Sequence, residues 1–250
     1  MRKELLASLS MIGSLAAAGA AAAQTCATPP SCATLGFTKS ETDCDGLEAL
    51  KCPFDQSKLY CPQGGGNMSA AAPGAILYSD GTISDSVIAS KTPVGIVAYV
   101  NGSTGFAVAL TESNQTWGGY GYNVSCLGDM DSGAASADMN GRVNTQCLVS
   151  DSQTHPAANY CNTFSAVSSG KGSSGWYLPA AGELKAMSYS YGAINLGLQK
   201  LSKTQISSSY YWSSSEYDSN YAWHVSPSDG LMYYNRIKSG SRPVRCVIAL

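Results

Sequence analysis

The stretch GWYLPAAGELKAMSYSYGAINLGLQKL, residues 175–201, decides the fold class of this chain. A helix is predicted to start after Pro179, because Glu183 then falls in the first turn, where the positive end of the helix dipole favours an acid. Gly192 is expected to break this helix into two pieces. Apolar residues recur beyond Pro179 at spacings of three and four, which is the helical period: Leu184, Met187, Tyr191, Ile194, Leu198 and Leu201.

The segments around this stretch alternate between helix and strand patterns. An earlier helix is predicted from Pro156, since proline is tolerated in a first turn and Ala157, Cys161 and Phe164 follow at helical spacing. The polar, glycine-rich residues 112–149 are expected to be mostly irregular. Apolar runs bounded by turn residues predict strands at residues 75–78, 94–100, 105–110, 211–212, 222–226, 231–234 and 244–249. Two helices packed on small antiparallel sheets make an α+β domain.

Composition excludes several functional classes. Only 13% of the 250 residues are charged, and 15 basic against 17 acidic residues give a net charge of −2. Such a chain has no basic excess to neutralise phosphates, so we expect no nucleic-acid partner. No phosphate-binding glycine-rich motif occurs either, and no cofactor is expected.

The first residues have the pattern of a signal peptide. Arg2 and Lys3 precede an uncharged, alanine-rich stretch that ends in small residues, so cleavage is expected after residue 23. No later stretch has the roughly 20 apolar residues of a membrane span. The mature protein is therefore expected to be periplasmic, cell-surface or extracellular, without membrane insertion.

Nine cysteines in an exported chain indicate disulfides. Five of them (Cys26, Cys32, Cys44, Cys52 and Cys61) lie in a short Cys-rich module, residues 24–63, whose pairing stays open. A Gly/Ala linker, residues 64–72, separates this module from the main domain, residues 73–250. Within that domain, a Cys126–Cys147 disulfide would restrain the polar loop.

The motifs of the second half resemble a known bacterial family. They are Gly175-Trp176-Tyr177-Leu178-Pro179, Gly182-Glu183-Leu184, residues 211–216, Ala222-Trp223 and residues 242–247. Together they resemble the C-terminal domain of the Legionella collagen-like adhesin, whose family is similar to C-type-lectin-like domains of the formylglycine-generating-enzyme variety. The resemblance implies a C-type-lectin-like fold over residues 73–250 and a disulfide between the first helix and the last strand, Cys161–Cys246.

A second resemblance covers residues 210–242. This segment resembles the variable regions that diversity-generating retroelements rewrite at adenines, because Trp212, Glu216, Trp223 and Met232 alternate with Tyr, Asn, Asp, Ser and His. An ordinary polar strand-and-loop segment explains the same composition, so both interpretations stay open.

If residues 223–226 form a strand, alternation sends Trp223 and Val225 to the core, and His224 and Ser226 to an exposed face. Tyr, Ser and Asn displayed on a rigid frame are typical of antibody-like binding surfaces. The predicted scaffold comprises Trp176, Trp212, Trp223 and the disulfides Cys161–Cys246 and Cys126–Cys147. The predicted ligand-binding residues are Tyr217, Asp218, Tyr221, His224, Ser226, Ser228, Leu231, Tyr233, Tyr234, Arg236 and Ile237.

Catalytic and metal-binding interpretations are less well supported. No Gly-x-Ser-x-Gly motif is present, neither His155 nor His224 lies in a triad signature, and the loop at Asp129–Gly133 lacks the late glutamate of a calcium site. We therefore expect no catalytic residue and no metal. The expected function is that of an exported bacterial adhesin-like protein, not an enzyme, whose ligand is a protein or glycan on another cell or particle. The alternatives are a formylglycine-generating-type or hydrolytic enzyme, and a structural subunit of a pilus or envelope layer.

Overall fold

The computed structural model describes residues 72–101 and 104–250, together with the strand backbone of residues 37–40, 50–52 and 55–62. The predicted signal peptide, Cys26, Cys32, Cys44 and the side chains of Cys52 and Cys61 lie outside the described part, as does most of the linker. The N-terminal strands β1 (Phe37–Ser40), β2 (Leu50–Cys52) and β3 (Asp55–Pro62) pair antiparallel in the order β1-β3-β2.

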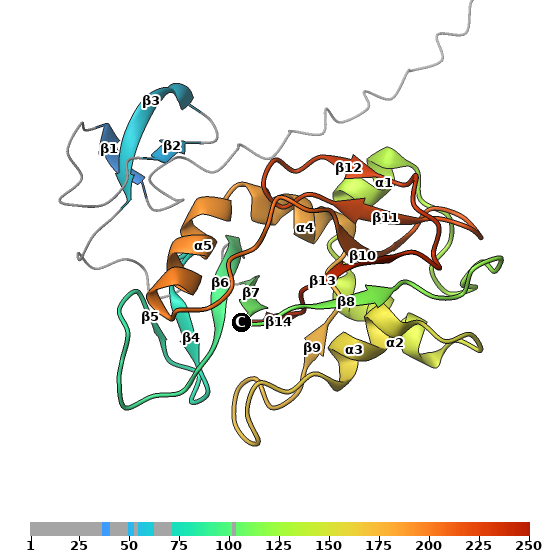
Figure 1. Ribbon diagram of the computed structural model, residues 1–250, viewed down its shortest axis with the longest axis horizontal. Coiled ribbons are helices and arrows are strands. Elements are labelled where there is room, and N and C mark those ends of the chain that lie inside the picture. Colours follow the sequence, from blue (N-terminus) through green and yellow to red (C-terminus); the bar gives the residue numbers. More distant parts are fainter. Residues whose placement is uncertain (1–36, 41–49, 53–54, 63–71, 102–103) are drawn as a thin grey trace, which may run out of the picture.

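A six-stranded antiparallel sheet is the centre of the main domain (Figure 1). The last strand of the chain, β14 (Val247–Ala249), enters this sheet between β7 (Thr104–Ala109) and β9 (Trp176–Tyr177). Residues far apart in sequence thereby become neighbours, as in the register Val108↔Val247. In spatial order the strands are β5 (Ile83–Ser84), β4 (Ile76–Tyr78), β6 (Pro93–Asn101), β7 (Thr104–Ala109), β14 (Val247–Ala249) and β9 (Trp176–Tyr177).

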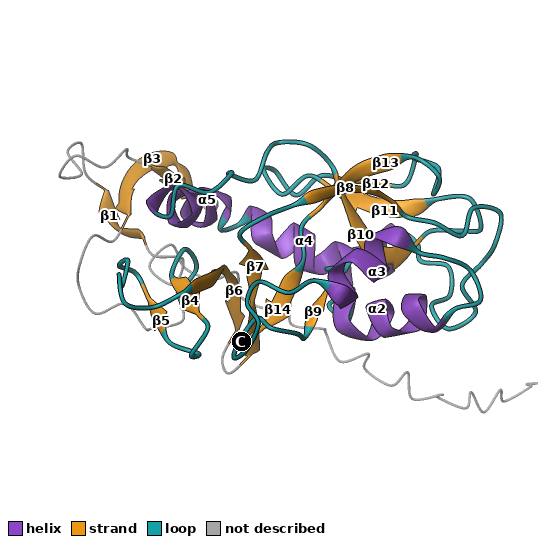
Figure 2. Ribbon diagram, turned by 60° about the horizontal axis from the view of Figure 1, so that its bottom comes forward, coloured by secondary structure: helices purple, strands orange, loops and turns teal. Residues whose placement is uncertain are grey.

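Alternation along these strands fills both faces of the sheet with apolar side chains. Ile96 and Val108 belong to one buried cluster, whereas Ala107 and Ile248 belong to the cluster on the opposite face. Helices α4 (Ala181–Ser188) and α5 (Tyr191–Lys200) contribute to the first cluster, and α2 (Gly141–Ser150) and α3 (Pro156–Thr163) to the second (Figure 2). Helices on both faces bury the sheet, which explains its near-continuous apolar sequence.

Two smaller sheets lie at the other end of the domain. Strands β10 (Tyr211–Glu216), β11 (Ala222–Val225) and β12 (Met232–Tyr233) form an antiparallel sheet in that order, which makes β12 an edge strand. Strands β8 (Ser113–Thr116) and β13 (Ser241–Val244) form a two-stranded ribbon beside β10. The chain then passes directly from β13 through Arg245 and Cys246 into β14.

The α+β class and the antiparallel sheets are confirmed, but two predictions were wrong. Residues 112–149 are not mostly irregular: they contain β8, α2 and α1 (Ser132–Ala137), so the described residues form five helices instead of two. The helical pattern of residues 181–200 does break, but at Tyr189 and Ser190 instead of Gly192. The predicted strand at residues 244–249 is divided between β13 and β14.

Candidate functional site

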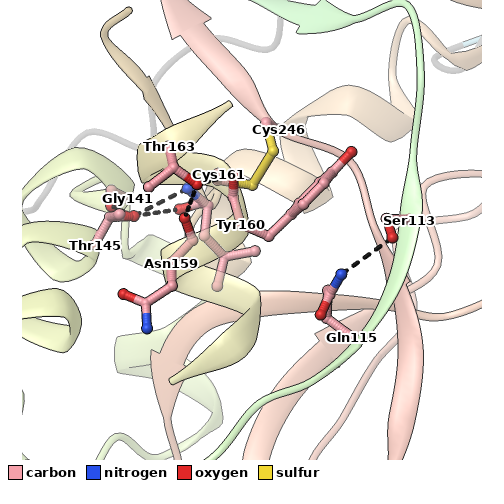
Figure 3. The surroundings of a disulfide bond; sticks show 10 residues. Ser113, Gln115, Gly141, Thr145, Asn159, Tyr160, Cys161, Thr163 and Cys246 are labelled. Carbon is pink, nitrogen blue, oxygen red and sulfur yellow. Dashed lines mark hydrogen bonds between the residues drawn. A yellow bond between two sulfur atoms is a disulfide. The ribbon is translucent and has the colours of Figure 1, made fainter. Parts of the chain in front are cut away.

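Two disulfides hold the frame of the domain, and both pairings are those predicted. Cys161 of α3 is bonded to Cys246, which lies between β13 and β14, with 5.2 Å between the Cα atoms and a sequence separation of 85 (Figure 3). Cys126 is bonded to Cys147 of α2, with Cα atoms 6.0 Å apart. All four cysteines of the described main domain are therefore oxidised.

The three predicted scaffold tryptophans are buried, and each indole N–H donates to a backbone carbonyl. Trp176 Nε1 donates to Gly172 O (2.8 Å), Trp212 Nε1 to Gln115 O (3.1 Å), and Trp223 Nε1 to Met130 O (3.0 Å). These bonds tie β9 to the loop just before it, β10 to strand β8, and β11 to the loop that carries Met130. The scaffold role of these residues agrees with their burial.

Sequence reasoning missed the fourth buried tryptophan. Trp117 Nε1 donates to Ser213 O (2.8 Å), and the indole ring makes a T-shaped contact with the imidazole ring of His155. Trp117 follows directly after β8, in the stretch predicted to be irregular, where no periodic pattern indicated burial.

Alternation along β11 places Trp223 and Val225 in the core, as predicted. On the opposite face of the small sheet, Trp212, His224 and Tyr233 form a row, since the register pairs Trp212 with His224 and His224 with Tyr233. This outer face is where exposed ligand-binding residues were expected.

His224 is not exposed, and that prediction was wrong. Only 1% of His224 is accessible, because the rings of Tyr210 and Trp212 pack against its imidazole in T-shaped contacts, with ring centroids 5.5 and 5.6 Å away. Burial, followed by the positive charge of Arg242, lowers the pKa of His224 to about 4. The imidazole is therefore neutral at pH 7 and packs as part of the frame.

Ser226 is also buried instead of exposed. Its backbone N–H donates to Leu231 O (2.9 Å), and its hydroxyl pairs with that of half-buried Ser228 at 2.9 Å. Both serines thus shape the turn between β11 and β12 and leave little of their surface to a ligand.

Five of the predicted ligand-binding residues are exposed and follow one another around β12. We call them the C-terminal face: Leu231, Tyr233, Tyr234, Arg236 and Ile237. The four large hydrophobic members of this face are each between 41% and 49% exposed to solvent. Large apolar side chains gathered on a surface are a feature of interaction sites.

The three remaining predicted residues are half-buried and support this face from beside it. Tyr217 stacks on Tyr234 with ring centroids 3.9 Å apart, and Tyr221 pairs with Ile237 in an isolated antiparallel bridge. Asp218 Oδ1 accepts the backbone N–H groups of Asn220 (2.7 Å) and Tyr221 (2.9 Å), which closes the loop between β10 and β11.

A fully buried ion pair, which sequence reasoning did not identify, joins the loops below the C-terminal face. Lys238 Nζ bonds the carboxylate of Glu216 and also donates to Tyr122 O (2.8 Å). Glu216 in turn accepts the backbone N–H of Val124 at 3.0 Å. Burial raises the pKa of Glu216 and lowers that of Lys238, and each partner opposes the shift of the other.

Two further exposed tyrosines lie next to the C-terminal face. Tyr120 and Tyr122 are more than half exposed, and the loop that carries them is held in place because Gly121 N donates to Ser219 O (2.9 Å). Lys238 O accepts the N–H groups of Trp117 and Gly118 from the same loop. The alternation Gly119-Tyr120-Gly121-Tyr122 was a sequence signal for an exposed aromatic loop.

The geometry around the histidines offers no nucleophile. His155 is buried and bonds Asp151 Oδ2 through Nε2 at 2.9 Å, while His224 lies within the aromatic row. In the described part of the chain, neither imidazole bonds a serine, threonine or cysteine side chain.

The acidic loop weighed as a calcium site is the start of a helix. Asp131 Oδ1 accepts the Ala134 N–H at 2.8 Å as the N-cap of α1. No group of three His, Cys, Asp or Glu side chains suitable for a metal occurs among the described residues.

The fold and site define a disulfide-bonded α+β domain whose antiparallel sheets carry an exposed aromatic surface near the C-terminus. The chain belongs to the Lcl C-terminal domain family, whose model matches residues 122–248, just over half of its length. This confirms the resemblance drawn from the motifs. No curated protein matches the chain.

A solved structure of a fimbrial protein from Bacteroides ovatus is similar in fold. The TM-score is 0.55 at 20% sequence identity, over 70% of this chain. The chain spans about half of that protein, since the match covers 48% of it.

Proposed function

We propose that the chain is an exported bacterial surface or secreted binding protein, adhesin-like and not an enzyme. In this proposal its main domain is C-type-lectin-like, and its C-terminal face binds a protein or glycan on another cell or particle. The observation that carries the proposal is the exposure of Leu231, Tyr233, Tyr234, Arg236 and Ile237 on a frame of buried tryptophans and disulfides. Tyrosine gives a large amphipathic contact area and loses little rotamer entropy on binding.

The division between buried and exposed residues also supports the variable-region hypothesis. Adenine-directed mutagenesis of Asn codons can produce Tyr, Ser, Asp, His, Arg, Ile or Leu, but not Trp, Glu or Met. Within residues 210–242, Trp212, Glu216 and Trp223 are fully buried, whereas the five members of the C-terminal face are Leu, Tyr, Arg and Ile. The three residues of types that the process cannot write thus lie in the frame and the exposed face consists of types that it can write, although writable types such as His224 and Ser226 are also buried in the frame.

Export is supported by the two disulfides, which persist in oxidising compartments. Over the residues that the structure describes, no helix is both long and apolar enough to cross a membrane.

A binding role is favoured over catalysis by the state of the cysteines and histidines. A formylglycine-generating mechanism needs reactive thiols, but Cys126, Cys147, Cys161 and Cys246 are all in disulfides. A hydrolase of the Ser-His type needs a hydroxyl bonded to an imidazole, which neither His155 nor His224 has in the described chain.

An adhesion assay tests the proposal. Beads coated with the full mature chain are incubated with bacterial and mammalian cells, and bound beads are counted against beads coated with Tyr233→Ser/Ile237→Ser. A matched control, Val87→Ser/Val143→Ser, removes two exposed apolar residues from elsewhere on the domain. We expect the control to adhere like the unaltered chain and the first variant to lose adhesion. Equal adhesion by both variants, or none by the unaltered chain, would contradict the proposal.

The match to a protein described as fimbrial favours a second candidate, a structural subunit of a pilus or envelope layer. In that case the odd number of cysteines would support cross-linking between chains. Electron microscopy and a non-reducing gel of the purified chain distinguish the two: filaments and ladders favour the subunit, and a soluble species that adheres favours the adhesin.

A further inference from the structure

Arg242 of β13 forms no ion pair with any residue that the structure describes. Its guanidinium carbon lies 5.8 Å from the ring centroid of Tyr210 and 5.6 Å from that of Trp212, so the group is held against two aromatic rings. Its Nε is buried and has no hydrogen-bond partner within the described residues. A guanidinium presents a planar fork of donors that matches a carboxylate, and within the described residues no carboxylate pairs with that of Arg242.

Arg236, which follows β12, provides a second unpaired cation nearby. It is exposed and makes no hydrogen bond or ion pair in the described part of the chain. The side chain of Arg236 packs against Gly240, two residues before Arg242, and its positive charge, after burial, lowers the pKa of Arg242. The carboxylate of Asp229, near Tyr210, accepts the Leu231 N–H at 3.1 Å in the turn before β12.

Tyrosine rings connect Arg242 with the edge strand β12. Tyr210, beneath Arg242, meets Tyr233 edge to face at 5.3 Å, and Tyr233 is 43% exposed on β12. We call the resulting surface the arginine–tyrosine patch: Tyr210, Tyr233, Arg236 and Arg242. Of these residues, Tyr210 and Arg242 were not among the predicted ligand-binding residues.

The edge strand β12 adjoins the patch and has free backbone groups. Because Ser226 N donates to Leu231 O, and bonded pairs in an antiparallel ladder alternate, Tyr233 directs its backbone groups toward His224. The N–H and C=O groups of Met232 and Tyr234 therefore point away from β11, and no described residue bonds them. A free strand edge of this kind can pair with an added strand.

We infer that the arginine–tyrosine patch and the edge of β12 bind an extended acidic segment of a partner protein. The segment pairs with β12 as a fourth strand and places a carboxylate on Arg236 and Arg242. This inference rests on the proposed binding function and specifies its ligand. A peptide is favoured over an acidic glycan because only a peptide supplies backbone N–H and C=O groups in the register of the free edge, while its carboxylates complement the two arginines.

The first experiment measures peptide binding to the full mature chain by fluorescence anisotropy. The probe is a fluorescein-labelled peptide of about ten residues that alternates glutamate with valine, which favours an extended strand. Its matched control replaces each glutamate by glutamine. We expect the glutamate peptide to bind, and the glutamine peptide to bind about ten-fold more weakly or not at all.

Variants of the chain then assign the site. Arg236→Met/Arg242→Met should weaken binding of the glutamate peptide about ten-fold or more, while Arg142→Met, an exposed arginine of α2, should leave it unchanged. The melting temperature of each variant shows that the domain is still folded. A peptide N-methylated at every second amide tests the strand edge: one of the two methylation registers should lose binding, and the other should keep it.

Four results would overturn the inference: no binding of the glutamate peptide, equal binding by both peptides, equal binding by the double arginine variant, or equal binding in both methylation registers. Heparin, a sulfated glycan, is added as a competitor, and binding of heparin in place of the peptide would also overturn it. The bead assay separates this failure from failure of the proposed function. Beads that adhere to cells while no acidic peptide binds refute only the peptide ligand, whereas loss of both refutes the binding function as well.

Discussion

The six-stranded sheet and the sheet β10-β11-β12 are both antiparallel, yet their faces are filled differently. In the six-stranded sheet, apolar side chains from strands and helices cover both faces. In the smaller sheet, the inner face packs Trp223 and Val225 into the core, but the outer face is covered by aromatic rings and an arginine. The six-stranded sheet, buried on both faces, forms the core of the domain. The small sheet has an outer face that is only partly covered and therefore offers side chains to solvent.

Replacing Trp223 by alanine should have the largest effect on stability. The side chain is 2% exposed and its N–H donates to Met130 O, so truncation leaves a large cavity and an unpaired carbonyl. We expect a loss of about 3–5 kcal/mol in the free energy of unfolding, measured by urea denaturation. A loss below about 1 kcal/mol would show that the inner face of the small sheet contributes little to the core.

Replacing Lys238 by methionine should cost about 3 kcal/mol in the free energy of unfolding, because it leaves the Glu216 carboxylate buried without its counter-ion. The double variant Glu216→Gln/Lys238→Met should regain part of this loss, since a neutral amide can still accept the Val124 N–H. Urea denaturation of both variants measures the difference. If the double variant is no more stable than Lys238→Met, then the buried charge is not the cause.

The covered outer face should make stability depend on pH through His224. The pKa of His224 is lowered to about 4 in the folded chain, against about 6.5 for a free histidine. Between these values the unfolded chain binds the proton and the folded chain does not, so stability falls as the pH drops from about 6.5 to about 4. The expected loss is on the order of 2 kcal/mol.

Comparison of the unaltered chain with His224→Gln isolates this contribution. Glu183 titrates in the opposite sense, since burial raises its pKa to about 7 and its stabilising neutral form is lost as the pH rises. Glu183 is present in both chains, so its effect cancels in the difference. Parallel pH profiles for the two chains would mean that His224 is more open to water than its packing shows.

Replacing Tyr233 by alanine should have the smallest effect on stability and a large effect on binding. Tyr233 is 43% exposed, its ring meets that of Tyr210 edge to face, and it lies roughly parallel to the His224 ring with the centroids 6.4 Å apart. We expect a change within about 1 kcal/mol in the free energy of unfolding, with loss of bead adhesion. A stability loss as large as that of Trp223→Ala would place Tyr233 in the frame instead of the binding surface.

Local periodicity was enough to predict the parts of the fold that are regular and apolar. Helices α3, α4 and α5 and strands β4, β6 and β7 carry clear patterns, and the motifs identified the family. Helices α1 and α2 were missed because their sequences are short and polar: α2 is fixed by tertiary bonds, including the Cys126–Cys147 disulfide and Leu178 N donating to Thr145 Oγ1 at 2.9 Å. The bonding partners Cys126 and Leu178 lie outside residues 132–150, so the local sequence of these residues could not indicate them.

The candidate site was predicted in part for the same reason. Alternation correctly assigned Trp223 to the core and His224 to the other face, but it could not show that Tyr210, Trp212 and Arg242 cover that face. The Glu216–Lys238 pair joins residues 22 apart, and its third partner, Tyr122 O, lies 116 residues from Lys238. Such contacts exist only once the chain is folded.

The Glu216–Lys238 pair has a consequence for how this surface can change over generations. The two residues of the pair bond the surrounding loops through main-chain atoms of those loops. Lys238 Nζ donates to Tyr122 O, the carboxylate of Glu216 accepts from Val124 N, and the backbone N–H of Lys238 donates to Asn220 O. Main-chain atoms are the same whatever residue occurs at a position. The outward side chains can therefore be substituted without loosening the loops, which under the proposed binding function would change the ligand while the shape of the surface is kept.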